Sequence, residues 1–177
     1  ELTNLTSMAA VAACEAIEEV SGQTPGIKWV NDIYINGRKV SGILTEASIS
    51  MESGSVEYVV VGIGFNVYPP EDGFSREIEN IAGAIFDQRK DDGKNLLAAG
   101  FLNHFMNYYA EFDKKDYVKK YRERSLVVGK EITVLAPSGN RKALALEVDD
   151  TCALIVQYED GSKERLNSGE ISIRESH

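Results

Sequence analysis

The residues best suited to chemistry gather in one short stretch of the sequence. Lys28, Asn31 and Asp32 interrupt an otherwise apolar run, and Arg38 and Lys39 follow a few residues later. Cations, a carboxylate and an amide so close together can hold an anionic group or offset charge that develops during a reaction. An ordinary structural role also fits, because two cations beside a turn are often only a solvated hairpin end, and Asp32 can simply pair with a cation such as Lys28.

Glycines inside predicted strands mark a second feature. Gly42, Gly62 and Gly64 weaken the strands that contain them, which is tolerated where a ligand approaches the backbone, although strand glycines also mark β-bulges. Asn66 follows closely and fits an ordinary turn ahead of two prolines. Because residues 62–64 lack the third glycine and following helix of a dinucleotide fingerprint, Rossmann-type binding is excluded. The residues alone predict a small-ligand site with glycine-thinned walls and a cation at one rim, and they do not name the ligand.

The elements that must position these residues follow from periodicity and turn residues. Apolar residues recur at helical spacing in residues 1–20, and a glycine soon afterwards ends that helix. Asn36-Gly37 is the typical pair of a type I′ turn and predicts a β-hairpin. With a further turn at residues 52–54, the sequence predicts an antiparallel meander of three strands, at residues 27–35, 40–49 and 57–67.

The middle of the sequence predicts helices. A short helix is expected at residues 75–86 and a longer one at residues 94–112, capped by Asp91 or Asp92. Residues 114–124 continue helically with a mostly solvated, charged surface. The longer helix carries an apolar stripe that we expect to be buried, formed by Leu97, Phe101, Phe105, Tyr108 and Phe112.

The last third changes to short strands separated by turn residues. Five strands in about fifty residues are typical of a small barrel, and they are expected at residues 132–134, 143–148, 153–158, 165–166 and 171–173. This change of pattern predicts a domain boundary near Ser125, with one domain at residues 1–124 and a second at residues 125–177.

Composition narrows the function classes. The 177 residues carry a net charge of −9, which argues against sequence-independent nucleic-acid binding. No apolar run reaches membrane-spanning length and no signal peptide opens the chain, so no membrane partner is expected. Two cysteines and two histidines argue against a zinc site, and free thiols favour the reducing cytoplasm. Because the chain opens with Glu1 and no lead-in strand, we expect it to be a fragment cut upstream of a helix.

Several motifs resemble one family. Residues 28–32 (KWVND) with residues 42–46 (GILTE) resemble the KWPND…KxxGIL(x)E signature of biotin–protein ligases. Residues 62–66 (GIGFN) resemble that family's GxGxN, and residues 169–174 resemble the ending of its C-terminal SH3-like domain. The order of the motifs fits, so the similarity covers essentially the whole chain. Val30 replaces the family's proline, which is expected to be harmless within a strand, and the family's glycine/arginine-rich biotin loop, which lies upstream, is absent from this sequence.

The resemblance implies a fold and an activity. The fold would be α+β, with an antiparallel or mixed sheet carrying helices on one face, as in class II synthetases and biotin/lipoate ligases, followed by a small SH3-like β-barrel. The enzyme would be an ATP-dependent, AMP-forming biotin–[acetyl-CoA-carboxylase] ligase that makes biotinyl-5′-AMP and transfers biotin to a lysine of a carrier protein. Because the arginine-rich loop is absent, the chain is expected to be inactive alone.

The resemblance also implies roles for individual residues. Lys39 would be the catalytic cation on the adenylate, and its compact ammonium suits that task. Four residues would line the biotin pocket: Gly42, Leu44, Gly62 and Gly64. Asn31, Asn66 and Arg174 would contact ATP or the adenylate. Biotin and ATP would be the substrates, Mg²⁺ would arrive with ATP, and no dedicated metal site is visible.

Partners and alternatives are implied in the same way. The acceptor would be a biotin carboxyl carrier domain, and a homodimer would form through the region of residues 50–55. DNA would be a partner only if an N-terminal helix-turn-helix exists outside this sequence. The alternatives are the effector-binding part of a bifunctional ligase and transcriptional repressor, a lipoate ligase of the same fold, and a noncatalytic binding module.

Overall fold

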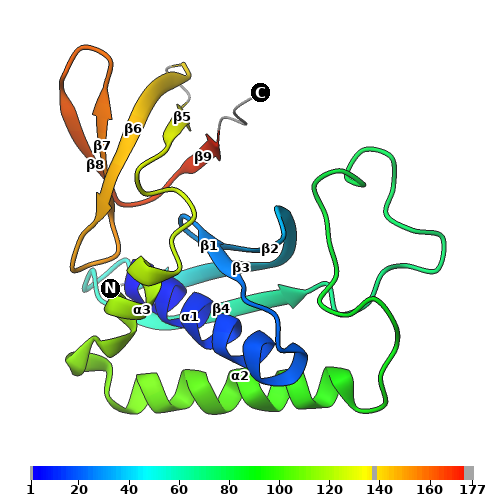
Figure 1. Ribbon diagram of the computed structural model, residues 1–177. Coiled ribbons are helices and arrows are strands. Elements are labelled where there is room, and N and C mark those ends of the chain that lie inside the picture. The colour runs from blue at the N-terminus through cyan, green and yellow to red at the C-terminus, as the bar shows by residue number, and fades with distance from the viewer. Residues whose placement is uncertain (1, 137–138, 174–177) are drawn as a thin grey trace.

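The computed structural model describes residues 2–136 and 139–173, and the chain begins with a deeply buried helix (Figure 1). This helix, α1 (Leu2–Ser21), agrees with the helix predicted at residues 1–20. Its central residues, Met8 to Cys14, are fully buried. A helix that is apolar on nearly all sides must be covered on nearly all sides, and α1 lies between a sheet and two further helices (Figure 1). Gly22, with φ of 69°, follows it in the left-handed region.

The first sheet has four antiparallel strands in chain order. They are β1 (Gly26–Lys28), β2 (Asp32–Ile35), β3 (Arg38–Ile49) and β4 (Val56–Phe65). The predicted meander is confirmed with one correction, because the single strand expected at residues 27–35 is wrong. The chain turns back at residues 29–31, so that Lys28 lies opposite Asp32. Val30 is therefore in a turn and not within a strand. The buried Trp29 side chain, only 3% exposed, anchors that turn.

The hairpin between β2 and β3 has the predicted turn. Asn36 and Gly37 have φ of 50° and 75°, as a type I′ turn requires at both central positions. Between β3 and β4, Gly54 has φ of 68° and confirms the second predicted turn. These two turns set the register of the face that carries the candidate site.

Two further helices pack with α1 on one face of the sheet. Helix α2 (Gly93–Ala110) confirms the long predicted helix, although Asp92 provides no side-chain cap, contrary to expectation. The approach to α1 is close, since a Cβ added at Gly100 would lie 3.4 Å from Ala16 Cβ. After a 3₁₀ turn (Phe112–Lys114), α3 (Asp116–Glu123) buries Tyr117, Val118 and Tyr121. Most of the other residues of this segment are charged and exposed, as predicted.

The helix predicted at residues 75–86 is not formed. The segment between β4 and α2 consists of turns and extended chain (Figure 1). Its residues 81–83 run beside the start of β3, where a short parallel bridge joins Lys39 to Ala82. The segment occupies the place beside β3 beyond the end of β4. Two of its backbone hydrogen bonds go to Lys39 of β3 and two go to residues 66 and 67, whereas residues 75–82 form only isolated turns within themselves.

The C-terminal part forms a second antiparallel sheet. Its strands are β5 (Glu131–Leu135), β6 (Arg141–Val148), β7 (Leu154–Tyr158), β8 (Lys163–Leu166) and β9 (Glu170–Ile173), in the order β8-β7-β6-β5-β9. The five predicted strands are confirmed and the fold is α+β. An SH3-like domain is consistent with this sheet, although no pairing among the described residues joins β8 to β9 to close a barrel.

Buried contacts join the two sheets. The indole N–H of Trp29 donates to the carbonyl of Cys152 at 3.0 Å. The chain between α3 and β5 also pairs with β1, since Ile27 N–H donates to Arg124 O and Leu126 N–H donates to Ile27 O. The division into domains at residues 124 and 125 stays a prediction. No helix among the described residues is both long and apolar enough to cross a membrane.

Candidate active site on the open face of the first sheet

One face of the first sheet is left uncovered by the helices. Alternation along β3 and β4 turns Ile43 toward the helices and leaves Leu44 63% exposed on the opposite face. On this open face, Asp32, Gly42 and Gly64 lie in one row across three strands, and Leu44 lies opposite Gly62 in the next row. Figure 1 shows the second sheet near one end of this face and the loop of residues 66–92 near the other.

An ion pair occupies the start of this row. Lys39 Nζ lies 2.6 Å from Asp32 Oδ1, with the two side chains 39% and 21% exposed. A Cβ added at Gly42 would lie 3.2 Å from Lys39 Cε, 3.3 Å from its Nζ and 3.4 Å from Asp32 Oδ1. The missing side chain at Gly42 therefore makes room for the ion pair.

The backbone of Lys39 is held from both sides. In addition to its pairing with β2, its N–H donates to Ile81 O at 2.8 Å, and its carbonyl accepts from Gly83 N–H at 2.8 Å. The Asn66 amide Nδ2 donates to the same carbonyl at 3.3 Å. A cation whose main chain is fixed in this way can be preorganised toward one position above the sheet.

Arg38 fastens the segment that holds Lys39. Its guanidinium donates to the carbonyls of Glu79 and Ala82. Gly83 is required by this packing, because a Cβ there would lie 2.7 Å from Arg38 Cβ. Arg38 is therefore more than the solvated end of a hairpin, because it also holds residues 79–83 against β3. Sequence reasoning missed residues 79–83, whose only signal was a glycine between alanines.

The predicted asparagines shape the same region. Asn31 Nδ2 donates to Ile43 O at 2.6 Å, and Ile43 N–H donates to Asn31 O at 3.1 Å, so the turn at residues 29–31 is tied to β3. Asn66 N–H donates to Val40 O at 2.8 Å. Both side-chain amides thus donate to carbonyls of β3 on either side of Gly42.

Gly62 and Gly64 differ from Gly42. Among the described residues, chain neighbours aside, the nearest atom to an added Cβ at Gly62 is Leu44 O at 3.6 Å, and at Gly64 no such atom lies within 4 Å. Pairing of β3 with β4 is regular at all three positions, and the only register shift lies further along, between Ser48 and Ile49. The bulge alternative is therefore wrong for these glycines. Neither internal packing nor turn geometry requires glycine at residues 62 and 64, which favours the approach of a ligand.

Two lysines, one carboxylate and one phenol set the local charge. Lys28 Nζ lies 5.9 Å from the ring centre of Tyr34, and among the described ion pairs Asp32 is joined to Lys39. Burial, followed by the negative charge of Asp32, raises the pKa of the Tyr34 phenol, which therefore stays neutral at ordinary pH. The site thus presents a net positive charge on an acidic protein, which suits an anionic ligand. The predicted residue Arg174 lies outside the described residues.

The comparisons with known proteins agree with this arrangement. Residues 1–66 match the model of the Biotin/lipoate A/B protein ligase family, and residues 127–174 match the Biotin protein ligase C terminal domain. The chain belongs to the biotin–protein ligase family. It is 32% identical over 177 residues to the "Bifunctional ligase/repressor BirA" of Bacillus spizizenii, covering 96% of this chain and 52% of the relative.

A second relative and a solved structure extend the likeness. A "Biotin--[acetyl-CoA-carboxylase] ligase" of Mycobacterium tuberculosis is 27% identical over 154 residues, covering 82% of this chain and 53% of the relative. The structure of a mutant biotin protein ligase from Aquifex aeolicus in complex with biotin superposes with a TM-score of 0.82 at 25% identity, covering 99% of this chain and 72% of that chain. This biotin–protein ligase chain spans about half the length of the two curated relatives.

Proposed function

We propose that the intact protein is an ATP-dependent biotin–protein ligase. It activates biotin as biotinyl-5′-AMP and then transfers the biotinyl group to a lysine of a biotin carrier domain. The observation that carries the proposal is the Lys39–Asp32 ion pair, which is set on an open, glycine-lined sheet face in a member of this family. The ligase names of the Bacillus and Mycobacterium relatives and the biotin complex of the Aquifex structure support it.

The first step joins two anions. A carboxylate oxygen of biotin forms a bond to the α-phosphorus of ATP, and the bond from that phosphorus to the bridging oxygen breaks, so that pyrophosphate leaves with the electron pair. Negative charge builds on the phosphoryl oxygens in the transition state, and the Lys39 ammonium stabilises it there. Asp32 orients this ammonium before substrate arrives, and Lys28, directly opposite Asp32, adds a second positive charge. Mg²⁺ arrives with ATP as part of the substrate.

The open glycines receive biotin. Gly62 and Gly64 leave the backbone of β4 accessible, so a flat ring system can lie against it, and the exposed Leu44 supplies an apolar contact. Gly42 borders the same space, where its missing side chain keeps the Lys39–Asp32 pair within reach of the biotin carboxylate.

The asparagines bind the nucleotide. Asn31 and Asn66 each use an Nδ2 hydrogen bond to fix the amide against β3, which orients the amide oxygen as an acceptor for an exocyclic amino group. We keep Arg174 in this set on the resemblance alone.

In the second step the amine of a carrier lysine attacks the carbonyl carbon of the mixed anhydride. The amide bond forms, the bond to the phosphate oxygen breaks, and AMP leaves. The chain alone is proposed to be inactive, since the family's arginine-rich loop is not part of this sequence. Buried, unpaired Cys14 and Cys152 fit a reducing compartment, which supports a cytoplasmic location.

The ligase activity is common to the named relatives, whereas repression is not. Both the relative named a bifunctional ligase/repressor and the relative named only a ligase align with this chain. The likeness in this region therefore does not separate the two classes, and we propose only the ligase activity.

The test is direct formation of biotinyl-5′-AMP. The intact protein is incubated with Mg²⁺-ATP and either biotin or lipoic acid, and the acyl adenylate and released pyrophosphate are measured. We expect the adenylate with biotin and little with lipoic acid. Adenylate formed only with lipoic acid would assign the chain to the alternative ligase, and binding of biotin without any adenylate would leave a noncatalytic module.

A further inference from the structure

The turn that precedes Asp32 is attached to the second sheet. Trp29, in this turn, is almost fully buried, and its indole N–H donates to Cys152 O at 3.0 Å across 123 residues of sequence. The residues that follow Trp29 in the turn lead directly to Asp32, which contacts the proposed catalytic Lys39. Trp29, which makes this contact between the sheets, is thus only three residues before Asp32 of the ion pair.

The turn that offers the Cys152 carbonyl is unusually well fixed. Cys152 itself has φ of 60°, a left-handed conformation that is uncommon outside glycine. The Asp149 carboxylate accepts from Thr151 N–H at 2.8 Å, from Thr151 Oγ1 at 2.7 Å and from Ala153 N–H at 3.0 Å. Arg165 Nε holds the other carboxylate oxygen at 2.6 Å. The carbonyl that Trp29 contacts is therefore held in place by the second sheet's own hydrogen bonds.

On the other side of Trp29, the chain is bound at each step toward the site. The Tyr121 hydroxyl donates to Val30 O at 2.9 Å. Asn31 is hydrogen-bonded to β3 through both its side chain and its carbonyl. Asp32 then contacts Lys39. A displacement of Trp29 would therefore be transmitted to the carboxylate that orients the ammonium.

We propose that Trp29 is a positioning residue through which the turn at residues 149–153 sets the placement of the Asp32–Lys39 pair. The inference rests on the proposed ligase function and deepens it. Trp29 is buried and acts through Asp32, so it does not touch the substrate. The second sheet thereby contributes to the adenylation step without supplying a reacting group.

The experiment compares three variants of the intact protein, two that disturb the contact between Trp29 and Cys152 and one control. Trp29→Phe removes the N–H that reaches Cys152 and keeps an aromatic ring in the turn. Lys120→Ala is the control for lost stability, because the Lys120 ammonium pairs with Glu15 at 2.6 Å between the helices, away from residues 29–32 and from the turn at residues 149–153. The initial rate of biotinyl-5′-AMP formation is measured against ATP and biotin concentration, together with the melting temperature.

We expect Trp29→Phe to lower kcat for adenylate formation about tenfold while the KM values change less than about twofold, because misplacement of a catalytic group affects the transition state more than binding. Asp149→Ala, which loosens the partner turn and leaves Trp29 intact, should lower kcat in the same way. Lys120→Ala should lower the melting temperature and leave kcat unchanged.

Wild-type kcat in Trp29→Phe would overturn the inference, and so would an equal loss of kcat in Lys120→Ala, which would indicate general loosening. If Trp29→Phe does not fold, β-(3-benzothienyl)alanine at residue 29 replaces the N–H by sulfur at nearly the same shape and gives the same comparison. Absence of adenylate in the wild-type protein would reject the proposed function itself, whereas normal adenylate formation in wild type and variant alike rejects only the role of Trp29.

Discussion

Lys39 and Lys120 each contact a carboxylate oxygen at 2.6 Å, Lys39 on Asp32 in the first sheet and Lys120 on Glu15 between the helices. The exposures are also similar, with the lysines 39% and 43% exposed and the carboxylates 21% and 14% exposed. Length and burial therefore do not distinguish the two pairs. Their surroundings do.

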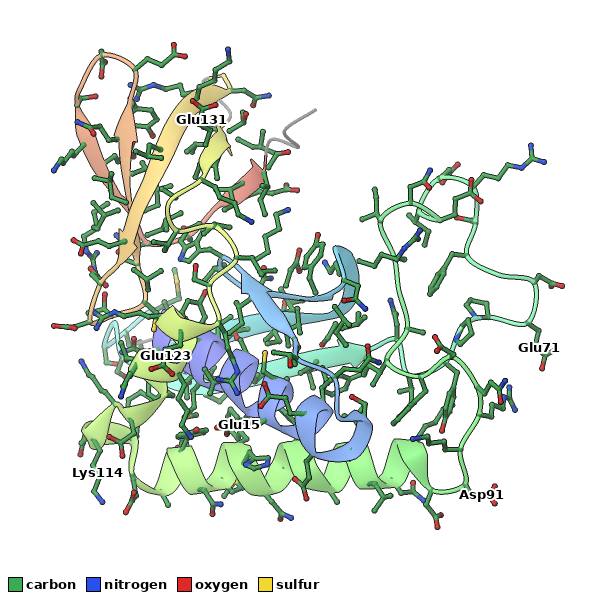
Figure 2. The ribbon with its side chains drawn as sticks, viewed as in Figure 1. Glu15, Glu71, Asp91, Lys114, Glu123 and Glu131 are labelled. Atoms are coloured by element: carbon green, nitrogen blue, oxygen red, sulfur yellow. The ribbon has the colours of Figure 1, made fainter. Side chains whose placement is uncertain are left out.

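The Glu15 carboxylate, labelled on α1 in Figure 2, is surrounded by further partners. The Tyr108 hydroxyl reaches both of its oxygens at 2.9 Å, His104 Nδ1 lies 3.5 Å from one of them, and Lys120 also donates to the Tyr108 hydroxyl. Residues from α1, α2 and α3 thus meet in one saturated cluster. Hydrogen bonds to Glu15 and then to Tyr108 raise the pKa of Lys120, as expected for a cation held by its own protein.

The Lys39–Asp32 pair has glycine beside it. Gly42 makes room for the pair itself, and the unfilled space next to it lies over Gly64, opposite Gly42 on β4. An ion pair that borders unfilled space can bind a ligand, whereas an ion pair enclosed by further donors has a structural role.

The largest effect is expected from Lys39→Ala. Loss of one preorganised donor should lower the rate of biotinyl-5′-AMP formation by about 10²–10³, with a change in melting temperature of no more than a few degrees. Single-turnover kinetics at saturating ATP and biotin measure the rate. Lys119→Ala is the matched control, because Lys119 is 84% exposed and lies 3.9 Å from Glu123. Adenylation by Lys39→Ala at the wild-type rate would remove this lysine from the mechanism.

Lys120→Ala is expected to lower the stability of the protein and to leave the rate of adenylate formation unchanged. It leaves the Glu15 carboxylate, 14% exposed, without its cation, and should lower the free energy of unfolding by about 1–3 kcal/mol. The rate of adenylate formation by the folded protein should stay within about twofold of wild type. Urea unfolding followed by circular dichroism measures the first quantity. A stable Lys120→Ala protein with impaired adenylation would erase the distinction between the two pairs.

Gly64→Ala sharpens the comparison on the open face. Within the part of the chain that the structure describes, the added Cβ meets no atom within 4 Å beyond its chain neighbours, so the free energy of unfolding should change by less than about 0.5 kcal/mol. If biotin lies against this strand, its KM should rise by about tenfold, since even one methyl group disturbs a close contact. Steady-state kinetics against biotin concentration provide the measurement. An unchanged KM for biotin would place the ring system elsewhere.

The smallest effect concerns a second enclosed carboxylate, Asp149. Burial alone would raise its pKa, but hydrogen bonds from Thr151, Arg165 and Ala153 lower it to about 2. Because the folded pKa lies below the ordinary value of 3.8, the stability that the ionised Asp149 contributes is fully present above pH 3.8. It is lost as the pH falls through about 2.

After allowance for solvent screening, the ionised Asp149 contributes about 1 kcal/mol to the free energy of unfolding. We expect Asp149→Asn to flatten the decrease in the free energy of unfolding between pH 4 and pH 2, measured by urea titrations at each pH. An equally steep decrease in this variant would assign the acid sensitivity to other carboxylates.

Local patterns predicted most of the elements. The Asn36-Gly37 turn, the burial of α1 and the five short C-terminal strands depend on periodicity and turn residues that lie within a few positions of one another. The helix predicted at residues 75–86 is wrong for the opposite reason, because part of this segment bonds to Lys39 of β3 and to residues 66 and 67, which its own sequence does not indicate.

The site was predictable in its residues and less so in its contacts. The sequence brought Lys39, Asp32 and the glycines together, but Lys28 stood closer to Asp32 along the chain and was the natural partner to expect. The turn at residues 29–31 also escaped prediction, because its anchor is the carbonyl of Cys152, which belongs to the second sheet.

The most direct test is a structure of the intact protein with biotinyl-5′-AMP bound. The account predicts Lys39 Nζ within about 3 Å of a phosphoryl oxygen, with the biotin ring over Gly62 and Gly64. An adenylate bound elsewhere, with Lys39 still paired to Asp32 and facing solvent, would contradict it.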